Sequence, residues 1–577
     1  MNILHITRSI LYSSLQEMLS DGLLSLGVAE TDILIEPTKE VMHGDFATNI
    51  AFLLAKINHK KPLDIARMFA DKLCSNHAFV KVEAAIPGFV NMFFSSIFLS
   101  KSISTINDNA TDFDSVAQGD LGDLNMEFVS ANPTGPMHVG HARGAIIGDI
   151  LSNVYSKLGY NVTKEFYIND AGSQIDSLSR SIYIRYMELM GEDVSGLVYE
   201  YPGDYIVDIA TILKNRHSRS LLSMDASIRN SLITKIALQH IMQGIKDDLK
   251  LLRVDHDVFV SETDLRAKGL VEKVVGFLQE KDLVYHGTTN APKGKMLDDW
   301  KPNECLLFNS SDFGDSEDRS LQKADGSWTY FAVDIAYHFY KYERGFNKMV
   351  VGLGKDHDGY VKRISAAVKA ISNDNVQLSI VFHNIVNFYD NGIAVKMSKR
   401  SGKILRIGDV VAEVGCDIVR FNMVSIDSAQ ILNFDFQKVK EQSKDNQLFY
   451  IQYAHARCTS AIAIIQDMFP NIKISNANLG LLANNKEMVL MRLMALWEYT
   501  LNVVANKCAP HYICIYLNNV ATALHALWNA GKDDDSLRFA VKNDEDISSA
   551  RLALVMATRT LLASGLKVLG IEPMNSM

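Results

Sequence analysis

The sequence predicts an α/β protein with a parallel sheet at its centre, a small α+β domain before it and an all-helical bundle after it. Three patterns predict this division. An apolar strand leads through a glycine-containing turn into a helix between residues 124 and 158, strand and helix patterns alternate beyond it, and strand patterns stop after about Phe436. Strand, glycine turn and helix is typical of the first unit of a nucleotide-binding parallel sheet.

The first hundred residues mix helical and strand-like segments and end in an alternating stretch at residues 80–94, interrupted by Pro87 and Gly88. Alternation around such a turn predicts a pair of strands that closes an α+β domain. Residues 106–120 are polar, rich in Asn and Asp and without apolar periodicity, so they are predicted to form a linker. We place the amino-terminal domain at residues 1–112.

The central domain is predicted at residues 124–436. Its first strand is expected at Leu124–Val129, and further strands at residues 348–353 and 378–383. The helix after the first strand has its apolar residues at Ile146, Ile150, Val154 and Leu158. The segment near residues 173–300 is mostly amphipathic helix and charge, which predicts an insertion between two halves of the sheet.

The last domain is predicted at residues 437–577 as a helical bundle. Between Met488 and Val504 the apolar residues recur at helical spacing, at Leu490, Leu493, Trp497, Leu501 and Val504. No internal repeat is visible in the chain.

Composition limits the class of protein. The chain has 577 residues, 47% of them hydrophobic and 22% charged, which is typical of a multidomain globular protein. No stretch approaches the roughly 18 apolar residues of a membrane span, and the start, Met1–Arg8, lacks the apolar core of a secretory signal. The six cysteines include no Cys-x-x-Cys pair, which disfavours disulfides and zinc and favours the reducing cytoplasm. With a net charge of -9, any RNA binding must depend on local patches.

The strongest motif is Ser130–His141, a turn with proline and glycine that contains His138-Val-Gly140-His141. At a helix start the two histidines share one face, and Gly140 lets a nucleotide approach the backbone where the helix favours phosphate. Both are therefore placed to donate to a developing negative charge. Taken alone, a His-x-x-His pattern favours a metal site, or one core and one surface histidine.

The second motif is the loop Val395–Lys403, which contains Lys396-Met397-Ser398-Lys399. Lysines can reach triphosphate oxygens, and a glycine-bearing loop can close over a ligand and reopen. Taken alone, such a run is more often a solvated basic loop.

Together the two motifs resemble those of the class I aminoacyl-tRNA synthetases, which have a His-x-Gly-His turn early in a Rossmann-like domain and a Lys-Met-Ser-Lys loop late in it. Several blocks are similar to those of the arginine enzymes: Glu127–Gly144, Tyr167–Gly172, Tyr201–Tyr205, Asp325–Tyr330, Asp334–Tyr337 and Gly354–Tyr360. The resemblance runs from His43–Asn49 to Met577 and covers nearly the whole chain. It implies a Rossmann-like parallel-sheet catalytic domain. Val139 replaces a more common isoleucine, and Arg400 stands where many class I loops have serine.

The resemblance also implies the residues of the sites. The catalytic residues are expected to be His138, His141, Lys396 and Lys399. The ATP-binding residues are expected to be Gly135, Gly140, His138, His141, Asp356, His357, Met397 and Ser398. The residues that read arginine are expected to be Glu127, Asn132, Tyr330 and Asp334, with Ser130 near the backbone groups of the substrate.

The chemistry of the substrate agrees with this set, because a guanidinium is a planar fork of donors that carboxylates match. Tyr330 and Asp334 are four residues apart and would share a helix face. In isolation they also fit a core tyrosine and an acid near a helix start. A metal-ligand interpretation of Asp356–Asp358 is a less favoured alternative.

The resemblance to the anticodon-binding bundle of arginyl and related synthetases implies RNA contacts in the last domain. The candidates are Tyr453, Arg457, His511 and Tyr516, because aromatic and basic groups together read unpaired bases. The pattern alone favours core positions for the tyrosines. The small amino-terminal domain is expected to contact transfer RNA as well.

The implied reaction is attack of the arginine carboxylate on the α-phosphorus of ATP, with Mg²⁺ on the triphosphate, then transfer of the arginyl group to tRNA(Arg). No zinc or other protein-bound metal is expected, and no association with a membrane. The protein is expected to be a monomer. A shorter nucleotidyl transferase of the same superfamily, acting on a small molecule, would need no helical bundle. A regulatory RNA-binding protein with a dead synthetase domain would be expected to have lost His138, His141 or Lys399, and all three are present.

Overall fold

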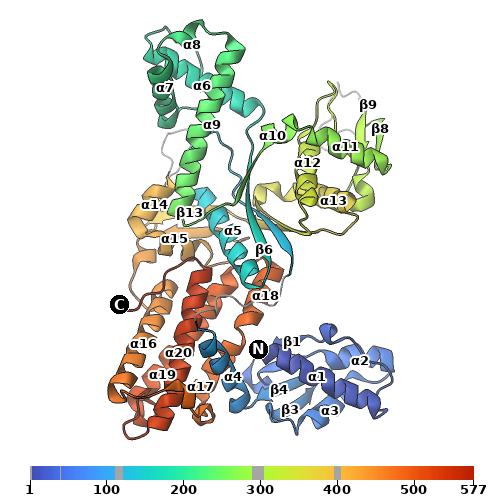
Figure 1. Cartoon of the computed structure of the whole chain (residues 1–577), viewed down its shortest axis with the longest axis vertical. Coiled ribbons are helices and arrows are strands. Elements are labelled where there is room, and N and C mark those ends of the chain that lie inside the picture. The colour runs from blue at the N-terminus through green and yellow to red at the C-terminus, as the bar shows by residue number, and fades with distance from the viewer. Residues whose placement is uncertain (1–2, 39, 111–120, 289–303, 396–404) are drawn as a thin grey trace. The chain divides into compact units, whose positions relative to one another are not determined.

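The computed structural model describes residues 3–38, 40–110, 121–288, 304–395 and 405–577 (Figure 1). The chain forms two compact units. One comprises Ala117–Glu441 and Cys508–His511, and the other comprises Met1–Val116, Gln442–Lys507 and Tyr512–Met577.

A parallel sheet of five strands lies at the centre of the first of these units, in the order β12-β11-β5-β6-β7. All four strand pairs are parallel, which confirms the predicted fold class. The strands are β5 (Asp123–Glu127), β6 (Asn161–Ile168), β7 (Val258–Ser261), β11 (Lys348–Gly354) and β12 (Gln377–His383). The strand order reverses between β5 and β11, and in such sheets ligands bind beyond the carboxyl ends of the strands at this point.

The helix α5 (Val139–Lys157) follows β5 and packs on the sheet. Its predicted apolar positions are all buried, as is Leu158 just beyond its end. Gly148 lies on the inner side of this helix, where an added Cβ would be 2.1 Å from the Cγ of Phe128. Only glycine therefore allows α5 to come this close to the end of β5.

Between β6 and β7 the chain forms four helices, α6 (Ser173–Leu189), α7 (Asp204–His217), α8 (Ser220–Ser223) and α9 (Ala226–Leu251). They form a separate helical group in Figure 1. Because β7 belongs to the sheet, the chain is back in the sheet by residue 258, well before the end of the insertion predicted near residues 173–300.

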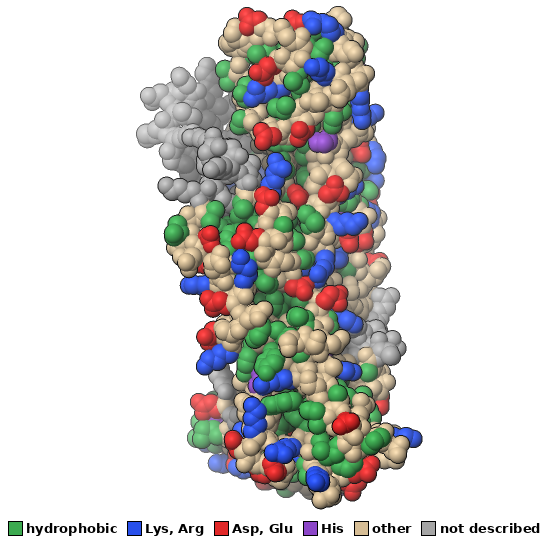
Figure 2. Space-filling model, turned by 90° about the vertical axis from the view of Figure 1, so that its left-hand side faces the viewer, with side chains coloured by type: hydrophobic (Ala, Val, Ile, Leu, Met, Phe, Trp, Pro, Cys, Tyr) green, Lys and Arg blue, Asp and Glu red, His purple; other side chains and the backbone are tan. Residues whose placement is uncertain are grey.

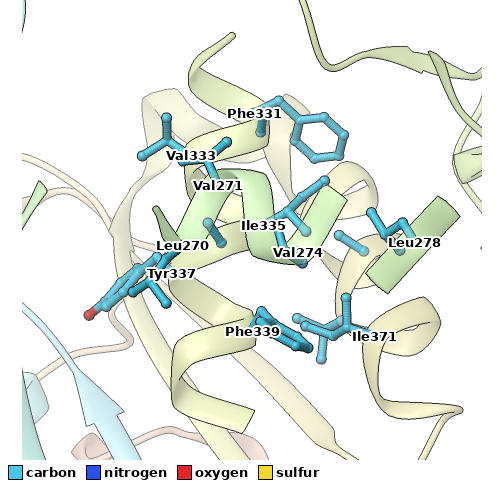
Figure 3. Close-up of a cluster of buried hydrophobic side chains, with 14 of the residues drawn as sticks. Leu270, Val271, Val274, Leu278, Phe331, Val333, Ile335, Tyr337, Phe339 and Ile371 are labelled. Atoms are coloured by element: carbon cyan, nitrogen blue, oxygen red, sulfur yellow. The ribbon is translucent and has the colours of Figure 1, made fainter. Parts of the chain in front are cut away.

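A second hydrophobic core lies beyond β7 (Figure 3). It is built from α10 (Glu262–Ala267), α11 (Leu270–Glu280), α12 (Tyr330–Glu343), α13 (Val361–Ser372), β8 (Val284–Thr288), β9 (Glu304–Phe308) and β10 (Arg319–Ser320). The side chains of Phe339 and Ile371 point toward one another in Figure 3, whereas the hydroxyl of Tyr337 points out of the cluster. This core fixes α12, which holds Asp334.

The rest of this unit is a smaller layer that follows β12. It consists of the three-stranded sheet β14-β13-β15 and two helices: β13 (Val386–Asp390), β14 (Ile393–Ala394), α14 (Ile407–Val414), α15 (Cys416–Met423) and β15 (Leu432–Asp435). Residues 396–404, which contain the predicted lysine loop, belong to this part of the chain but not to the described residues.

The amino-terminal part of the other unit has an antiparallel sheet in the order β1-β2-β4-β3. Its elements are α1 (Ile3–Ser20), β1 (Ile35–Pro37), β2 (Phe46–Thr48), α2 (Ile50–Asn58), α3 (Pro62–Leu73), β3 (Phe79–Ala85), β4 (Phe89–Phe94) and α4 (Ser96–Asp108). The strand pair predicted at residues 80–94 is confirmed as β3 and β4. The start of the predicted linker, residues 106–108, is helical, and residues 111–120 lie outside the described residues.

The carboxyl-terminal part of this unit is helical, as predicted: α16 (Gln447–Met468), α17 (Asn485–Ala495), α18 (Trp497–Lys507), α19 (His511–Asp533) and α20 (Glu545–Val568). The helix α4 packs against α17 and α20, and Asn107 Nδ2 donates to the carbonyl of Ala553 at 2.9 Å. Among the described residues, no single helix is long and apolar enough to cross a membrane, although the bent pair α17 and α18 together reaches that length and composition.

The apolar pattern between Met488 and Val504 predicts continuous helix, but the structure breaks it at Leu496, with a bend of 42°. The carbonyl of Leu493 would accept from the Trp497 amide in an unbroken helix. Here it accepts from the Leu496 amide at 3.0 Å and from the hydroxyl of Tyr516 at 2.7 Å. A side chain that takes a carbonyl of the helical ladder in this way is a known cause of a sharp bend.

Candidate active site

The two histidines of the signature turn cap the start of α5. His138 is the N-cap residue, and its Nδ1 accepts from the Gly140 amide at 3.1 Å. The Nδ1 of His141 accepts from the His138 amide at 3.2 Å, and the two rings are stacked with centroids 3.9 Å apart. Because each Nδ1 is an acceptor, a neutral ring has its proton on Nε2. Both histidines can thus donate from Nε2 at a helix start that favours negative charge.

Two glycines of the turn lie close to neighbouring side chains. A Cβ added to Gly140 would lie 2.8 Å from the His138 ring, and one added to Gly135 would lie 3.1 Å from the hydroxyl of Tyr205. That hydroxyl donates to the carbonyl of Thr134 at 2.7 Å. The side chains of Tyr205 and His138 therefore pack closely against the backbone of the turn and help to hold it in place.

The chain that follows the predicted lysine loop lies against this turn. The Val139 amide donates to the carbonyl of Leu405 at 3.1 Å, and His138 and Arg406 form an antiparallel bridge. Lys396, Met397, Ser398 and Lys399 themselves lie outside the described residues. Asp356 and His357 lie in η4 (Lys355–Tyr360), directly after β11, and their side chains are also outside the described residues.

Three carboxylates lie close enough to Tyr167 to raise the pKa of its hydroxyl, in addition to the effect of burial: Glu127, Glu262 and Asp334. Glu127 and Glu262 also raise the pKa of Asp334. The three come from distant parts of the sequence. Glu127 ends β5, Glu262 follows β7, and Asp334 lies in the first turns of α12. All three elements present these residues at the carboxyl-terminal side of the sheet strands, where ligands bind in this fold.

Each carboxylate has its own partner. The buried Lys341 donates from Nζ to Glu127 Oε2 at 2.6 Å, and Arg266 pairs with Glu262 at 2.7 Å. Asp334 Oδ2 accepts from the hydroxyl of Tyr360. Within the part of the chain that the structure describes, no ion pair to Asp334 is seen. Asp334 is thus the carboxylate of this group best placed to receive an external cation.

Burial raises the pKa of Asp334 to about 7, and the neighbouring carboxylates of Glu127 and Glu262 act in the same direction. The hydrogen bond from Tyr360 and the charge of Arg266 oppose this change. Burial makes the charged form of Asp334 unfavourable, and a cation bound beside it would stabilise that form.

The remaining predicted arginine residues lie around this cluster. Ser130 Oγ donates to Glu127 Oε1 at 3.3 Å and accepts from the Tyr167 amide at 3.1 Å. Asn132 is exposed, with its Nδ2 3.4 Å from Gln174 Oε1. Tyr330 begins α12 and is 64% exposed. The structure brings Glu127, Ser130 and Asp334 together, while Asn132 and Tyr330 are at more open positions.

Glu262, Tyr167 and Tyr360 also belong to this cluster, although the sequence did not predict them as site residues. Tyr167 donates from its hydroxyl to Glu262 Oε2 at 3.2 Å. A signal for Glu262 was present, because Ser261 is the N-cap of α10 and its Oγ accepts from the Asp264 amide. A capping serine followed by acids marks the start of a helix, but it does not show that a sheet strand ends there.

The four candidate RNA residues are at different depths of the bundle. Tyr516 is 5% exposed and His511 is 9% exposed. Tyr453 and Arg457 are half-buried, and the Arg457 guanidinium lies 4.2 Å from the centre of the Tyr453 ring. Arg457 also contacts His525, at 2.8 Å from Nη1 to Nδ1. Tyr453 and Arg457 therefore remain partly accessible, whereas Tyr516 lies in the interior.

Among the described residues, no group of three or more His, Cys, Asp and Glu side chains could hold a metal ion. Asp356–Asp358, for which a metal-ligand interpretation was an alternative, have side chains outside that set.

Known protein families and relatives match this chain over nearly all of its length. The profile of the class I (R) tRNA synthetase catalytic domain matches residues 109–441, that of the arginyl-tRNA synthetase N-terminal domain residues 9–94, and that of the DALR anticodon binding domain residues 451–577. The arginine–tRNA ligase of Wolbachia pipientis wMel is 45% identical over 577 residues, 100% of both chains. That of Ehrlichia ruminantium (strain Gardel) is 47% identical over 538 residues, 93% of this chain and 92% of the relative.

The structure of Thermus thermophilus arginyl-tRNA synthetase has the same fold, with a TM-score of 0.71 and 18% identity over 99% of this chain and 100% of that chain. The chain belongs to the arginyl-tRNA synthetase family.

Proposed function

We propose that this protein is an arginine–tRNA ligase that activates L-arginine with ATP and transfers it to tRNA(Arg), releasing AMP and pyrophosphate. Relatives of that name align with it over its full length. The observation that carries the proposal is the site itself. Two histidines with Nε2 donors stand at a helix start, and an acidic cluster lies in the same α/β unit.

In the first step, an oxygen of the arginine carboxylate attacks the α-phosphorus of ATP, and the bond from that phosphorus to the pyrophosphate oxygen breaks. His138 and His141 donate from Nε2 to the oxygens that gain charge, and Lys396 and Lys399 act on the triphosphate in the same way. Mg²⁺ bound with ATP supplies further positive charge to the phosphates. Gly135 and Gly140 let the nucleotide approach the turn, with Met397, Ser398, Asp356 and His357 around it.

Arginine is bound by the acidic cluster. Asp334 receives the guanidinium, because Glu127 and Glu262 are already paired with Lys341 and Arg266. Ser130 and Asn132 lie toward the turn and are assigned to the backbone end of the substrate. Tyr330 is exposed at the start of α12, and we assign it to cover the site.

In the second step, a hydroxyl of the terminal adenosine attacks the arginyl carbonyl and AMP leaves. We assign RNA binding to the domains at residues 1–112 and 437–577, and the chemistry to residues 124–436. The description of the matching DALR profile supports anticodon binding by the last domain. Within it, the partly accessible Tyr453 and Arg457 are stronger candidates than His511 and Tyr516.

We further propose that the enzyme works as a monomer in the cytoplasm. The described residues include all six cysteines and no disulfide between them, which supports a reducing compartment. Sedimentation at micromolar concentration tests the monomer.

The decisive experiment is exchange of pyrophosphate into ATP, measured with each of the twenty amino acids, with and without tRNA(Arg). We expect exchange with arginine alone among them, and formation of arginyl-tRNA(Arg). Exchange with another amino acid, or none in the presence of tRNA(Arg), would overturn the proposal.

A further inference from the structure

A buried arginine lies in the same helix as the two histidines. Arg143, two residues beyond His141 in α5, is fully buried. Four hydrogen bonds join its guanidinium to backbone carbonyls. Nε donates to Met423 at 3.2 Å, Nη1 to Asn384 at 3.2 Å and Gln430 at 2.6 Å, and Nη2 to Asp427 at 3.0 Å.

These carbonyls belong to two segments that bracket one part of the chain. Asn384 directly follows β12, and residues 423–430 join α15 to β15. The two segments also bond to each other, since the Asn384 amide donates to the carbonyl of Ser428 at 2.9 Å and Asn384 Nδ2 to that of Ala429 at 3.0 Å. Between them lie β13, β14, α14, α15 and the positions of the lysine loop. Arg143 therefore ties both ends of this part of the chain to α5.

The amino-terminal end of α5 contacts the same part of the chain at a third place, where Val139 meets Leu405 and His138 meets Arg406. The helix α5 thus contacts residues just before this part of the chain, within it and at its end. A shift of that part relative to α5 would have to break the contacts of Arg143.

The chemistry of these contacts requires arginine. Burial lowers the pKa of Arg143 to about 10, with the charge of Asp427 opposing, so the side chain stays charged at neutral pH. A buried guanidinium is tolerated only when its N–H groups find acceptors. The Met423 carbonyl ends α15 and has no partner in its own helix. A lysine has its three donors on one atom and cannot span four carbonyls from two segments.

We propose that Arg143 is a positioning residue for amino-acid activation, which holds the chain that carries the lysine loop in register with the histidines of α5. The inference rests on the proposed function. The first step needs groups from both parts on one triphosphate, and a displacement of about 1 Å costs roughly 10²-fold in rate. The residues proposed to bind arginine are Asp334, Ser130, Asn132 and Tyr330. None of them is among the hydrogen-bond partners of Arg143, so arginine binding should depend little on it. Transfer to tRNA expels no pyrophosphate and depends on this register much less.

The test is Arg143→Lys in the full-length enzyme, with two steps measured separately. Activation is measured by pyrophosphate exchange in the presence of tRNA(Arg), and transfer by single turnovers from synthetic arginyl-adenylate. We expect kcat for activation to fall about 10²-fold, the arginine KM to stay nearly unchanged, and transfer to fall far less. Equal loss of both steps, or no loss of activation, would overturn the proposal.

Arg551→Lys is the matched control. Arg551 is also buried, at 3% exposed, and Nη1 donates to the carbonyls of Ser536 and Arg538, both at 2.6 Å, but it lies in α20. The Arg551→Lys substitution should lower the melting temperature without changing the ratio of the activation rate to the transfer rate. If Arg143→Lys does not fold, Asn384→Ala is the deciding variant. It removes the bond to the Ala429 carbonyl and the bond from the Ile385 amide, keeps the backbone carbonyl that Arg143 binds, and should lower the same ratio by a smaller factor. An unchanged ratio would contradict the proposal. Failure of the unmutated enzyme to activate arginine would instead contradict the proposed function.

Discussion

His138 has a structural and a proposed chemical role on opposite sides of one ring. Its Nδ1 caps α5, and Nε2 is the proposed donor to the phosphates. His138→Ala removes both, and we expect it to lower the rate of arginine activation by roughly 10² to 10³ and stability by about 1 kcal/mol. Pyrophosphate exchange and thermal unfolding measure the two effects.

His138→Asn separates the two roles, because asparagine is among the best N-cap residues. It should restore most of the lost stability but not the rate. If His138→Asn recovered activity together with stability, the histidine would be a cap and nothing more.

The charged form of Asp334 is expected to destabilise the folded protein while it favours arginine binding. Its pKa is about 7 when folded, against 3.8 ordinarily, so the folded state holds a proton that the unfolded state releases. The contribution of this group to stability therefore falls as pH rises from about 4 to 7. Asp334→Asn should be more stable than the unmutated protein at pH 8, and this gain should disappear toward pH 4. Thermal unfolding across this range checks the sign.

The same substitution should raise the arginine KM about 10- to 100-fold, because a charge-assisted hydrogen bond contributes roughly 1.5–3 kcal/mol. In the unmutated enzyme the KM should rise as pH falls below 7, and in Asp334→Asn this dependence should be weaker. Citrulline, which keeps the shape of arginine without the charge, is the control substrate. Equal use of arginine and citrulline by the unmutated enzyme would contradict the role of Asp334.

At the scale of single residues, the local pattern predicted where the two histidines lie, because a loop before an amphipathic helix places both at the start of that helix. The acidic cluster was only partly predictable. Glu127 and Asp334 came from the resemblance, whereas Glu262 joins them only because β7 lies beside β6. The pairing of Glu127 with Lys341 joins residues 214 positions apart, which no local pattern encodes.

At the scale of elements, the break between α17 and α18 depends on a contact from another helix. Tyr516→Phe removes the hydroxyl that binds the carbonyl of Leu493. We expect it to lower the free energy of unfolding by about 1 kcal/mol and to leave the affinity for tRNA(Arg) unchanged, since Tyr516 is in the interior. Denaturant unfolding and a tRNA binding titration check both. Weaker tRNA binding at unchanged stability would instead assign Tyr516 to the RNA surface.

The elements themselves show where pattern suffices. Long amphipathic helices and apolar strands such as β11 and β12 were predictable from periodicity alone. The four-residue strand β7 was not, because it is short and lies among helices and charges. The break at Leu496 was not either, because no proline or glycine marks it and its cause is 20 residues away in Tyr516.

At the scale of the whole molecule, the chain lacks a general attraction for RNA. Its net charge is -9, and on the face drawn in Figure 2 acidic and basic side chains are interspersed. The amino-terminal domain and the bundle nevertheless form one compact unit, in which Arg492 pairs with Asp45. That association was not predictable, because it depends on contacts between residues more than 400 positions apart. Both candidate RNA-binding parts therefore belong to one unit.

This arrangement leads to the last prediction. The resemblance implies that arginine is activated only when transfer RNA is bound, yet the unit with the candidate RNA-binding parts supplies none of the proposed catalytic residues. Binding energy gained there would have to order the catalytic unit. Full-length protein freed of nucleic acid should therefore exchange pyrophosphate at least roughly tenfold more slowly than with tRNA(Arg), within the usual range of coupling between sites. Both predicted loop lysines, Lys396 and Lys399, are present in the sequence, which argues for the opposite outcome, activation without RNA. Equal exchange without RNA would show that the catalytic unit is complete by itself.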